Sequence, residues 1–183
     1  ISLFDGYLHS IYTDDFTVDI IERMFSIAKE ALCVPTTKND CNHILNTEAG
    51  QLHFLIDDEA GWGYMVDWEK PVIGEVAQDI AYFLSPTTTI WNTEFVFNAE
   101  MRKAFVDEYW NRVDGRFVLG SFDERFDGYV KMNCLRGITW SANAVVEYND
   151  PDRPLKNEYT RMKLGQYMDR RFLEYVFDSF FAQ

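Results

Sequence analysis

Apolar residues at helical spacing occupy most of the chain after Glu75, and this pattern most constrains the fold. The segments that show it are the run EVAQDIAYFL, which ends near SPTTT, and residues 94–113, 122–148 and 155–181. Steps of three and four residues place side chains on one face of a helix, so each segment is predicted to be an amphipathic helix. An earlier helix is predicted over about residues 16–33, after the capping signal TDD and before Pro35.

Short β-prone runs lie between the first helix and the later ones. HIL at 43–45 is followed by HFLI at 53–56, the turn-rich DDEAGWG, and YMV at 64–66. Two such runs around a Gly-containing turn predict a β-hairpin. The predicted fold class is therefore α+β and mostly helical: one helix, a small irregular β element with the hairpin, then four helices, in a single unit over residues 1–183.

Composition limits the classes of partner. The 183 residues are 47% hydrophobic, which is enough for a core, and their formal net charge is −13. Such an acidic chain is predicted to bind neither nucleic acid nor an anionic membrane, because both require clustered Lys and Arg. The charge is compatible with a cationic substrate, and solubility is the alternative explanation.

Cysteine usage and the ends of the sequence suggest a location. Three cysteines without CxxC spacing indicate neither a disulfide scaffold nor a zinc site, so a reducing, cytoplasmic setting is predicted. No run of eighteen apolar residues predicts a membrane span. The first residues, ISLFDGYLHS, contain neither an initiator Met nor a signal-peptide pattern, so we expect a preceding N-terminal part.

Three carboxylates stand out in YMVDWEKPVIGEVAQDIAYFL. Asp67 and Glu69 directly follow an apolar run, and Asp79 lies inside the next helical pattern. A strand that merely leaves the core has no need of two acids in three residues. Carboxylate oxygens are ligands that Mg²⁺ prefers, so the arrangement indicates a site for a metal and a phosphate.

Taken together, ILNTEAGQLHFLI and YMVDWEKP resemble the phosphotransfer core of the aminoglycoside phosphotransferase and choline kinase family, which shares the protein-kinase fold. That core has His-Gly-Asp, four residues and Asn, then Ile-Asp-Trp-Glu, a Gly/Pro-containing step and Asp-Leu-Ala. The matching residues here are Asn46–Glu48, His53, Val66–Glu69, Gly74 and Asp79–Ala81. The resemblance covers residues 44–90, and it implies that the chain is the C-terminal lobe of such an enzyme, with the hairpin carrying the catalytic and metal loops.

The resemblance implies a role for each matching residue. Asp67 corresponds to the Asp that binds the metal at the nucleotide phosphates, and His53 to an Asn that is the second metal ligand. Glu48 corresponds to the catalytic Asp that orients the substrate hydroxyl, and Asp79 to a helix Asp that braces the catalytic loop. Glu69 supports the metal site or forms a surface salt bridge. The alternatives are a solvated loop acid for Glu48 and a partly buried structural histidine for His53.

Two of these positions depart from the family pattern. Glu48 adds a methylene to the expected Asp, and such a displacement costs on the order of a hundredfold in rate where geometry is tight. His53 replaces an amide with imidazole, whereas Mg²⁺ prefers oxygen ligands and imidazole suits softer ions. The expected consequences are slow turnover, use of Mn²⁺ instead of Mg²⁺, or loss of catalysis.

The nucleotide-covering part of the family pattern is absent from this sequence. It contains no GxGxxG, and the upstream Lys29 and Lys38 fall in a predicted helix and loop rather than on a strand. We therefore expect this lobe alone to fold but to be inactive, and its partner to be the missing N-terminal lobe of the same protein.

The function predicted on this basis is an ATP-dependent kinase with Mg²⁺ as its ion and a small hydroxyl-bearing acceptor, such as an amino alcohol or aminoglycoside. Trp140, Glu147 and Tyr148 on the 122–148 helix are candidates for the acceptor cleft, with core packing as the alternative for the two aromatic residues. The runner-up function is a non-catalytic kinase-like domain that binds a ligand or a partner.

Overall fold

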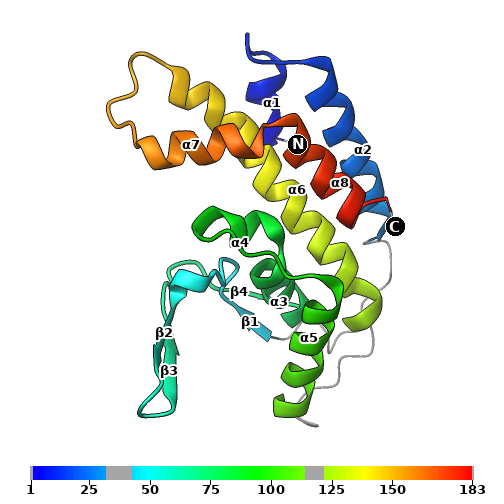
Figure 1. Cartoon of the computed structure of the whole chain (residues 1–183), viewed down its shortest axis with the longest axis vertical. Coiled ribbons are helices and arrows are strands. Elements are labelled where there is room, and N and C mark those ends of the chain that lie inside the picture. Colours follow the sequence, from blue (N-terminus) through cyan, green and yellow to red (C-terminus); the bar gives the residue numbers. More distant parts are fainter. Residues whose placement is uncertain (1, 32–42, 114–121, 183) are drawn as a thin grey trace. The chain divides into compact units, whose positions relative to one another are not determined.

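Helices dominate the computed structural model, which describes residues 2–31, 43–113 and 122–182 (Figure 1). About 65% is helical and two small antiparallel sheets supply the rest of the regular structure, so the α+β prediction is confirmed at this coarse level. The helices are α1 (Ser2–Leu8), α2 (Asp15–Ala31), α3 (Val76–Leu84), α4 (Pro86–Asn92), α5 (Ala99–Val113), α6 (Phe122–Asn149), α7 (Glu158–Tyr167) and α8 (Arg170–Phe180). The strands are β1 (His43–Leu45), β2 (Phe54–Asp57), β3 (Trp62–Met65) and β4 (Val72–Gly74), with a 3₁₀ turn η1 (Gln51–His53) before β2.

Within the described ranges, every helix is too short or too polar to cross a membrane.

The chain separates into two compact units. The first unit consists of Ile1–Glu30 with Lys131–Gln183, and the second unit is Ala31–Val130. The sequence predicted one unit over residues 1–183, and the structure distinguishes two within that range. Helix α6 contributes residues to both units.

The first unit has a core of helix faces. Helix α2 buries one apolar stripe, and α8 buries another; their residues are Ile20, Ile21, Met24 and Ala28, and Phe172, Leu173, Val176, Phe177 and Phe180. Within the capping signal TDD before α2, Asp14 is the residue that caps the helix. Its carboxylate accepts hydrogen bonds from the Thr17 backbone N–H and the Tyr7 hydroxyl, both at 3.0 Å. An Asp at this position satisfies an N–H group that the first helical turn leaves unpaired.

The second unit combines both sheets with α3, α4 and α5. The predicted hairpin is confirmed, with β2 and β3 antiparallel and Leu55 opposite Tyr64. Strand β4, which the sequence did not predict, pairs antiparallel with β1. One face of α3 packs in a core with α5 and the start of α6, formed by Ala77, Ile80, Leu84, Val106 and Phe122.

Two predicted helix boundaries were wrong. The segment 155–181 is two helices, because the Asp169 side chain accepts the Arg171 backbone N–H and starts α8 after α7 has ended. SPTTT starts a helix rather than only ending one: Pro86 occupies the first turn of α4, where a missing N–H costs nothing. The opening of the chain, for which no helix was predicted, contains α1. Pro35, predicted to stop the first helix, lies outside the described residues.

Candidate functional site

Asp79 holds the loop that follows β1. Its two carboxylate oxygens accept the backbone N–H groups of Asn46 at 2.7 Å and Thr47 at 2.9 Å. Burial raises the pKa of Asp79 above its ordinary value, and the two backbone hydrogen bonds only partly offset this effect. A carboxylate on α3 therefore fixes the residues that lead to Glu48.

Asn46 connects this loop to the residue that follows β3. Its amide Nδ2 donates to the Asp67 carbonyl at 2.8 Å, and its Oδ1 accepts the Glu48 backbone N–H at 3.1 Å. Asn46 is buried, and its side chain bonds the backbone of two candidate site residues, Glu48 and Asp67. The sequence reading gave Asn46 no role; a polar amide directly after a buried apolar strand is the signal that could have identified it.

His53 lies between Glu48 and Asp67. Its Nδ1 is 2.7 Å from the Glu48 carbonyl, which can only accept, so Nδ1 carries a hydrogen. Its Nε2 is 3.3 Å from Asp67 Oδ2. In the neutral ring with its hydrogen on Nδ1, Nε2 carries a lone pair, which the Asp67 carboxylate repels. The contact is favourable when Nε2 carries a hydrogen, or when Nε2 and Asp67 Oδ2 bind the same cation.

The backbone is left-handed at two non-glycine positions of this site. Thr47 has φ 70° and Asp67 has φ 63°. This region is unfavourable for residues with a Cβ, above all for β-branched Thr, and such residues persist where surrounding contacts hold them. Those contacts are the hydrogen bond that the Thr47 N–H donates to Asp79 and the one that the Asn46 side-chain amide donates to the Asp67 carbonyl.

The remaining carboxylates differ in their surroundings. Glu48 is exposed at the loop, with its backbone held at both ends. Glu69 forms the surface salt bridge that was one of its two predicted roles, with Lys70 Nζ 2.8 Å from its carboxylate.

Lys70 is a site residue that the sequence reading missed. The hydrogen bond to Glu69 raises the pKa of Lys70, and the negative charges of Glu48 and Asp67 add to that effect. A long, exposed cation therefore stands in the field of three carboxylates. Its position directly after DWE was the only signal in the sequence.

A metal would find two side-chain ligands here. Asp67 and His53 face each other, and among the residues that the structure describes no three His, Cys, Asp or Glu side chains gather as a metal site. Mg²⁺ is usually held by one or two carboxylates together with phosphates and waters, so two protein ligands suffice when phosphate supplies the others. The donor set fits such an ion, and its imidazole favours Mn²⁺ over Mg²⁺.

The three candidate acceptor residues belong to the first unit, separate from the residues above. Trp140 is exposed, so it does not fill the core, and Tyr148 is partly buried. The guanidinium of Arg153, which the sequence reading did not consider, lies 4.0 Å from the Tyr148 ring centroid and 3.0 Å from Glu147. The aromatic and acidic side chains proposed for a cationic ligand thus already bind a cation of the chain itself.

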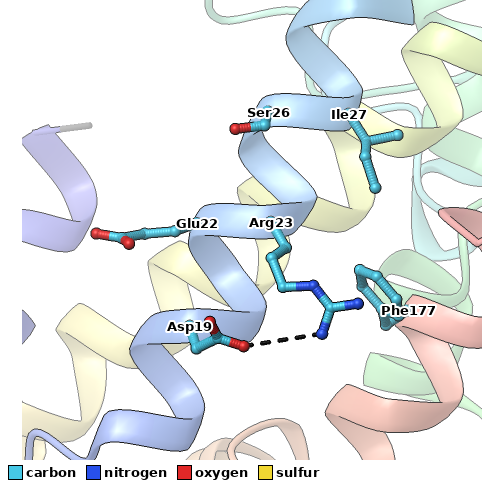
Figure 2. Close-up of a pocket in the computed structure, with 6 residues that line it drawn as sticks. All are labelled: Asp19, Glu22, Arg23, Ser26, Ile27 and Phe177. Carbon is cyan, nitrogen blue, oxygen red and sulfur yellow. Dashed lines mark ion pairs between the residues drawn. The ribbon is translucent and has the colours of Figure 1, made fainter.

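An open hollow of about 420 Å³ lies on α2 and α8 of the first unit (Figure 2). Arg23 stands at its centre, 3.7 Å from Asp19 and 4.3 Å from the Phe177 ring centroid. The remaining lining residues are Glu22, Ser26 and Ile27. Its central cation is engaged by an acid and a ring, and its carboxylates do not converge with a histidine or a second cation, so we assign no chemistry to it.

No protein-family model, curated protein or solved structure matches this chain.

Proposed function

We propose that the chain is the C-terminal lobe of an ATP-dependent phosphotransferase that acts on a small hydroxyl-bearing molecule. The observation that supports this most directly is the contact of Asp79 with the Asn46–Thr47 backbone, which fixes the loop carrying Glu48. Asn46 then joins that loop to Asp67. The proposed base Glu48 and the proposed metal ligand Asp67 lie on two loops, after β1 and after β3, that Asn46 joins.

Phosphoryl transfer needs positioning and charge neutralisation more than covalent chemistry from the protein. In this proposal Glu48 accepts or orients the proton of the acceptor hydroxyl. Asp67 and His53 hold a divalent ion, which would neutralise the phosphate charge, and Lys70 adds a positive charge from the side. In the proposal, ATP would be bound jointly with an N-terminal lobe of the same protein.

The acceptor class rests on the acidic chain. A net charge of −13 attracts cations. In a panel of amino alcohols, aminoglycosides and neutral sugars, the amino compounds should therefore be the better acceptors.

The test is binding and turnover in a protein that contains this chain and its N-terminal lobe. Replacing Asp67 by Ala should weaken Mn²⁺–ATP binding at least about tenfold, because it removes the carboxylate ligand. Glu48→Gln should lower ADP release by about a hundredfold while leaving binding intact. Asp58→Ala, an exposed acid on the same hairpin, is the matched control and should change neither quantity.

The same experiment addresses the second candidate, a non-catalytic kinase-like domain. The close contact of His53 Nε2 with Asp67 Oδ2 favours it, because the histidine lies at the carboxylate that a metal would otherwise bind. Nucleotide binding without turnover, unchanged by Glu48→Gln, would assign this second function. Equal metal–nucleotide binding by the wild type and Asp67→Ala would contradict the metal assignment of the phosphotransferase proposal.

A further inference from the structure

The β2–β3 hairpin exposes an apolar surface. Leu55 and Tyr64 lie opposite each other, and Trp62 follows on the same face two residues from Tyr64. These three side chains, the hairpin face, are 55%, 63% and 49% exposed respectively. The ring centroids of Trp62 and Tyr64 lie 4.8 Å apart, so the two rings are in edge-to-face contact.

The edges of this sheet are also open. Among the described residues β2 pairs with β3 alone, so each strand has one side without a neighbouring strand. In Figure 1 the hairpin extends away from α3 and α4 of the same unit. A contact between its first residue, Phe54, and Phe83 of α3 anchors it at 5.6 Å between ring centroids.

Solitary edges are normally protected. Lys, Pro or bulges can prevent another chain from pairing, and FLID and WGYM, strands of four residues each, contain neither Lys nor Pro and pair in regular register. A two-stranded hairpin is also marginal in water, and a third strand stabilises it. An exposed apolar face and an edge without Lys or Pro on one hairpin are the features of a strand-binding surface.

Charge selects the partner. Asp57, Asp58 and Glu59 form an acidic tip next to the hairpin face. A second copy of this chain would bring the same acidic tip and a net charge of −13 against it, which disfavours self-pairing. A strand with Lys or Arg would pair with the tip and could also stack a cation on Trp62 or Tyr64.

We propose that the hairpin binds an extended basic segment of a partner protein, which adds a strand to its edge and lays alternate apolar side chains on the hairpin face. This inference concerns an interaction surface and does not depend on the phosphotransferase proposal.

The probe is a fluorescent ten-residue peptide of alternating Val and Lys, measured by anisotropy in 0.15 M salt against the whole chain. We expect saturable binding, and at least about tenfold weaker binding of a Val/Glu peptide of the same length. A peptide with the same charge but alternate Val replaced by Pro should also bind at least about tenfold more weakly, because each Pro lacks an N–H and interrupts the hydrogen bonds to an edge.

Two sets of variants locate the site. Asp58→Lys with Glu59→Lys should weaken binding at least about tenfold, and Leu55→Lys should do the same. The control, Asp152→Lys with Asp178→Lys, makes an equal charge change at exposed positions of the first unit and should weaken binding less than about threefold. Leu55→Thr keeps strand propensity while removing the apolar contact, and circular dichroism checks that each variant is folded.

Three results would overturn the proposal. Equal weakening by the two double-lysine variants would show general charge attraction, and undiminished binding of the Pro-containing peptide would exclude strand addition. A concentration-dependent dimer in sedimentation that Leu55→Lys abolishes would assign the surface to a second copy instead.

Discussion

Asp79 satisfies two backbone donors with one side chain, and this has a measurable energetic consequence. Asp79→Ala leaves the N–H groups of Asn46 and Thr47 without their acceptor, at a cost of about 2 to 3 kcal/mol in the free energy of unfolding. Urea unfolding measures that cost, and hydrogen exchange at the two amides should accelerate more than at the α3 amides. Asp58→Ala, at an exposed turn, should stay within about 0.5 kcal/mol of wild type, and an equal loss there would contradict the assignment.

Asp14 gives the first unit a pH-dependent contribution to stability. Burial favours a higher pKa, but the hydrogen bonds from Thr17 and Tyr7 outweigh it and hold the pKa of Asp14 below its ordinary value of 3.8. A lowered folded-state pKa stabilises the fold above pH 3.8, and this contribution is lost as the pH falls through the folded-state pKa.

The corresponding prediction compares Asp14→Ala with wild type across pH. At pH 7 the variant should be less stable by about 1 kcal/mol, and the difference should shrink below the ordinary Asp pKa. Asp14→Asn retains a capping oxygen and should lose the pH dependence but little stability at pH 7. Thermal unfolding at pH 7, 4 and 2.5 measures both differences; a gap that is unchanged in acid would exclude this role.

At the residue level, the sequence pointed to acids but not to their partners. Asp67 and Asp79 could be selected because carboxylates directly after an apolar run and inside an apolar helical pattern are unusual, whereas Glu48 was selected only through the family resemblance. Asn46, Lys70 and Arg153 could not, because their roles depend on which backbone or ring the fold brings within hydrogen-bonding distance. Local spacing does not contain that information.

The start of α3 is joined to α6 by a buried ion pair. Arg125 Nε is 3.0 and 2.8 Å from the two carboxylate oxygens of Glu75, and both residues are buried. Removing one partner leaves the other as an uncompensated buried charge. Arg125→Met should therefore cost about 3 to 5 kcal/mol, measured by urea unfolding.

The double variant distinguishes loss of a pair from loss of packing. Glu75→Leu with Arg125→Met replaces both charges by apolar groups and should recover most of the stability. Lys103→Ala, which breaks an exposed pair with Asp107 in α5, is the control and should cost less than about 1 kcal/mol. A double variant as unstable as Arg125→Met alone would show that the ion pair itself is required.

Elements were predictable where a pattern was long enough to repeat. The hairpin followed from two β-prone runs around a Gly-containing turn, and α6 from apolar spacing over many residues. Strand β4 was missed because three residues between Pro71 and Glu75 are too few to show alternation. The break between α7 and α8 was missed because one capping side chain, Asp169, overrides a helical pattern that continues on both sides.

The net charge of −13 acts on the molecule as a whole. Self-repulsion among acids destabilises a compact chain, and salt screens it. Raising NaCl from about 10 to 300 mM should therefore increase the unfolding temperature by about 2 to 4 °C.

The control for this salt effect is the Asp152→Lys, Asp178→Lys variant. It removes two negative charges and adds two positive ones, so its unfolding temperature should rise less with NaCl. A lower unfolding temperature of the wild type in salt would mean that attractive surface pairs dominate instead.

The interrupted sequence of the first unit matters while the chain is being made. Its two stretches, Ile1–Glu30 and Lys131–Gln183, are separated by the whole second unit. A ribosome adds about 5 to 20 residues per second, so roughly 7 to 30 s pass between the emergence of α2 and that of α8. Throughout that interval α8 is not yet available to the apolar stripe of α2; in the folded protein Phe177 of α8 contacts Arg23 of α2. A cell that synthesises this chain therefore has to shield α2 from aggregation for longer than any helix of the second unit.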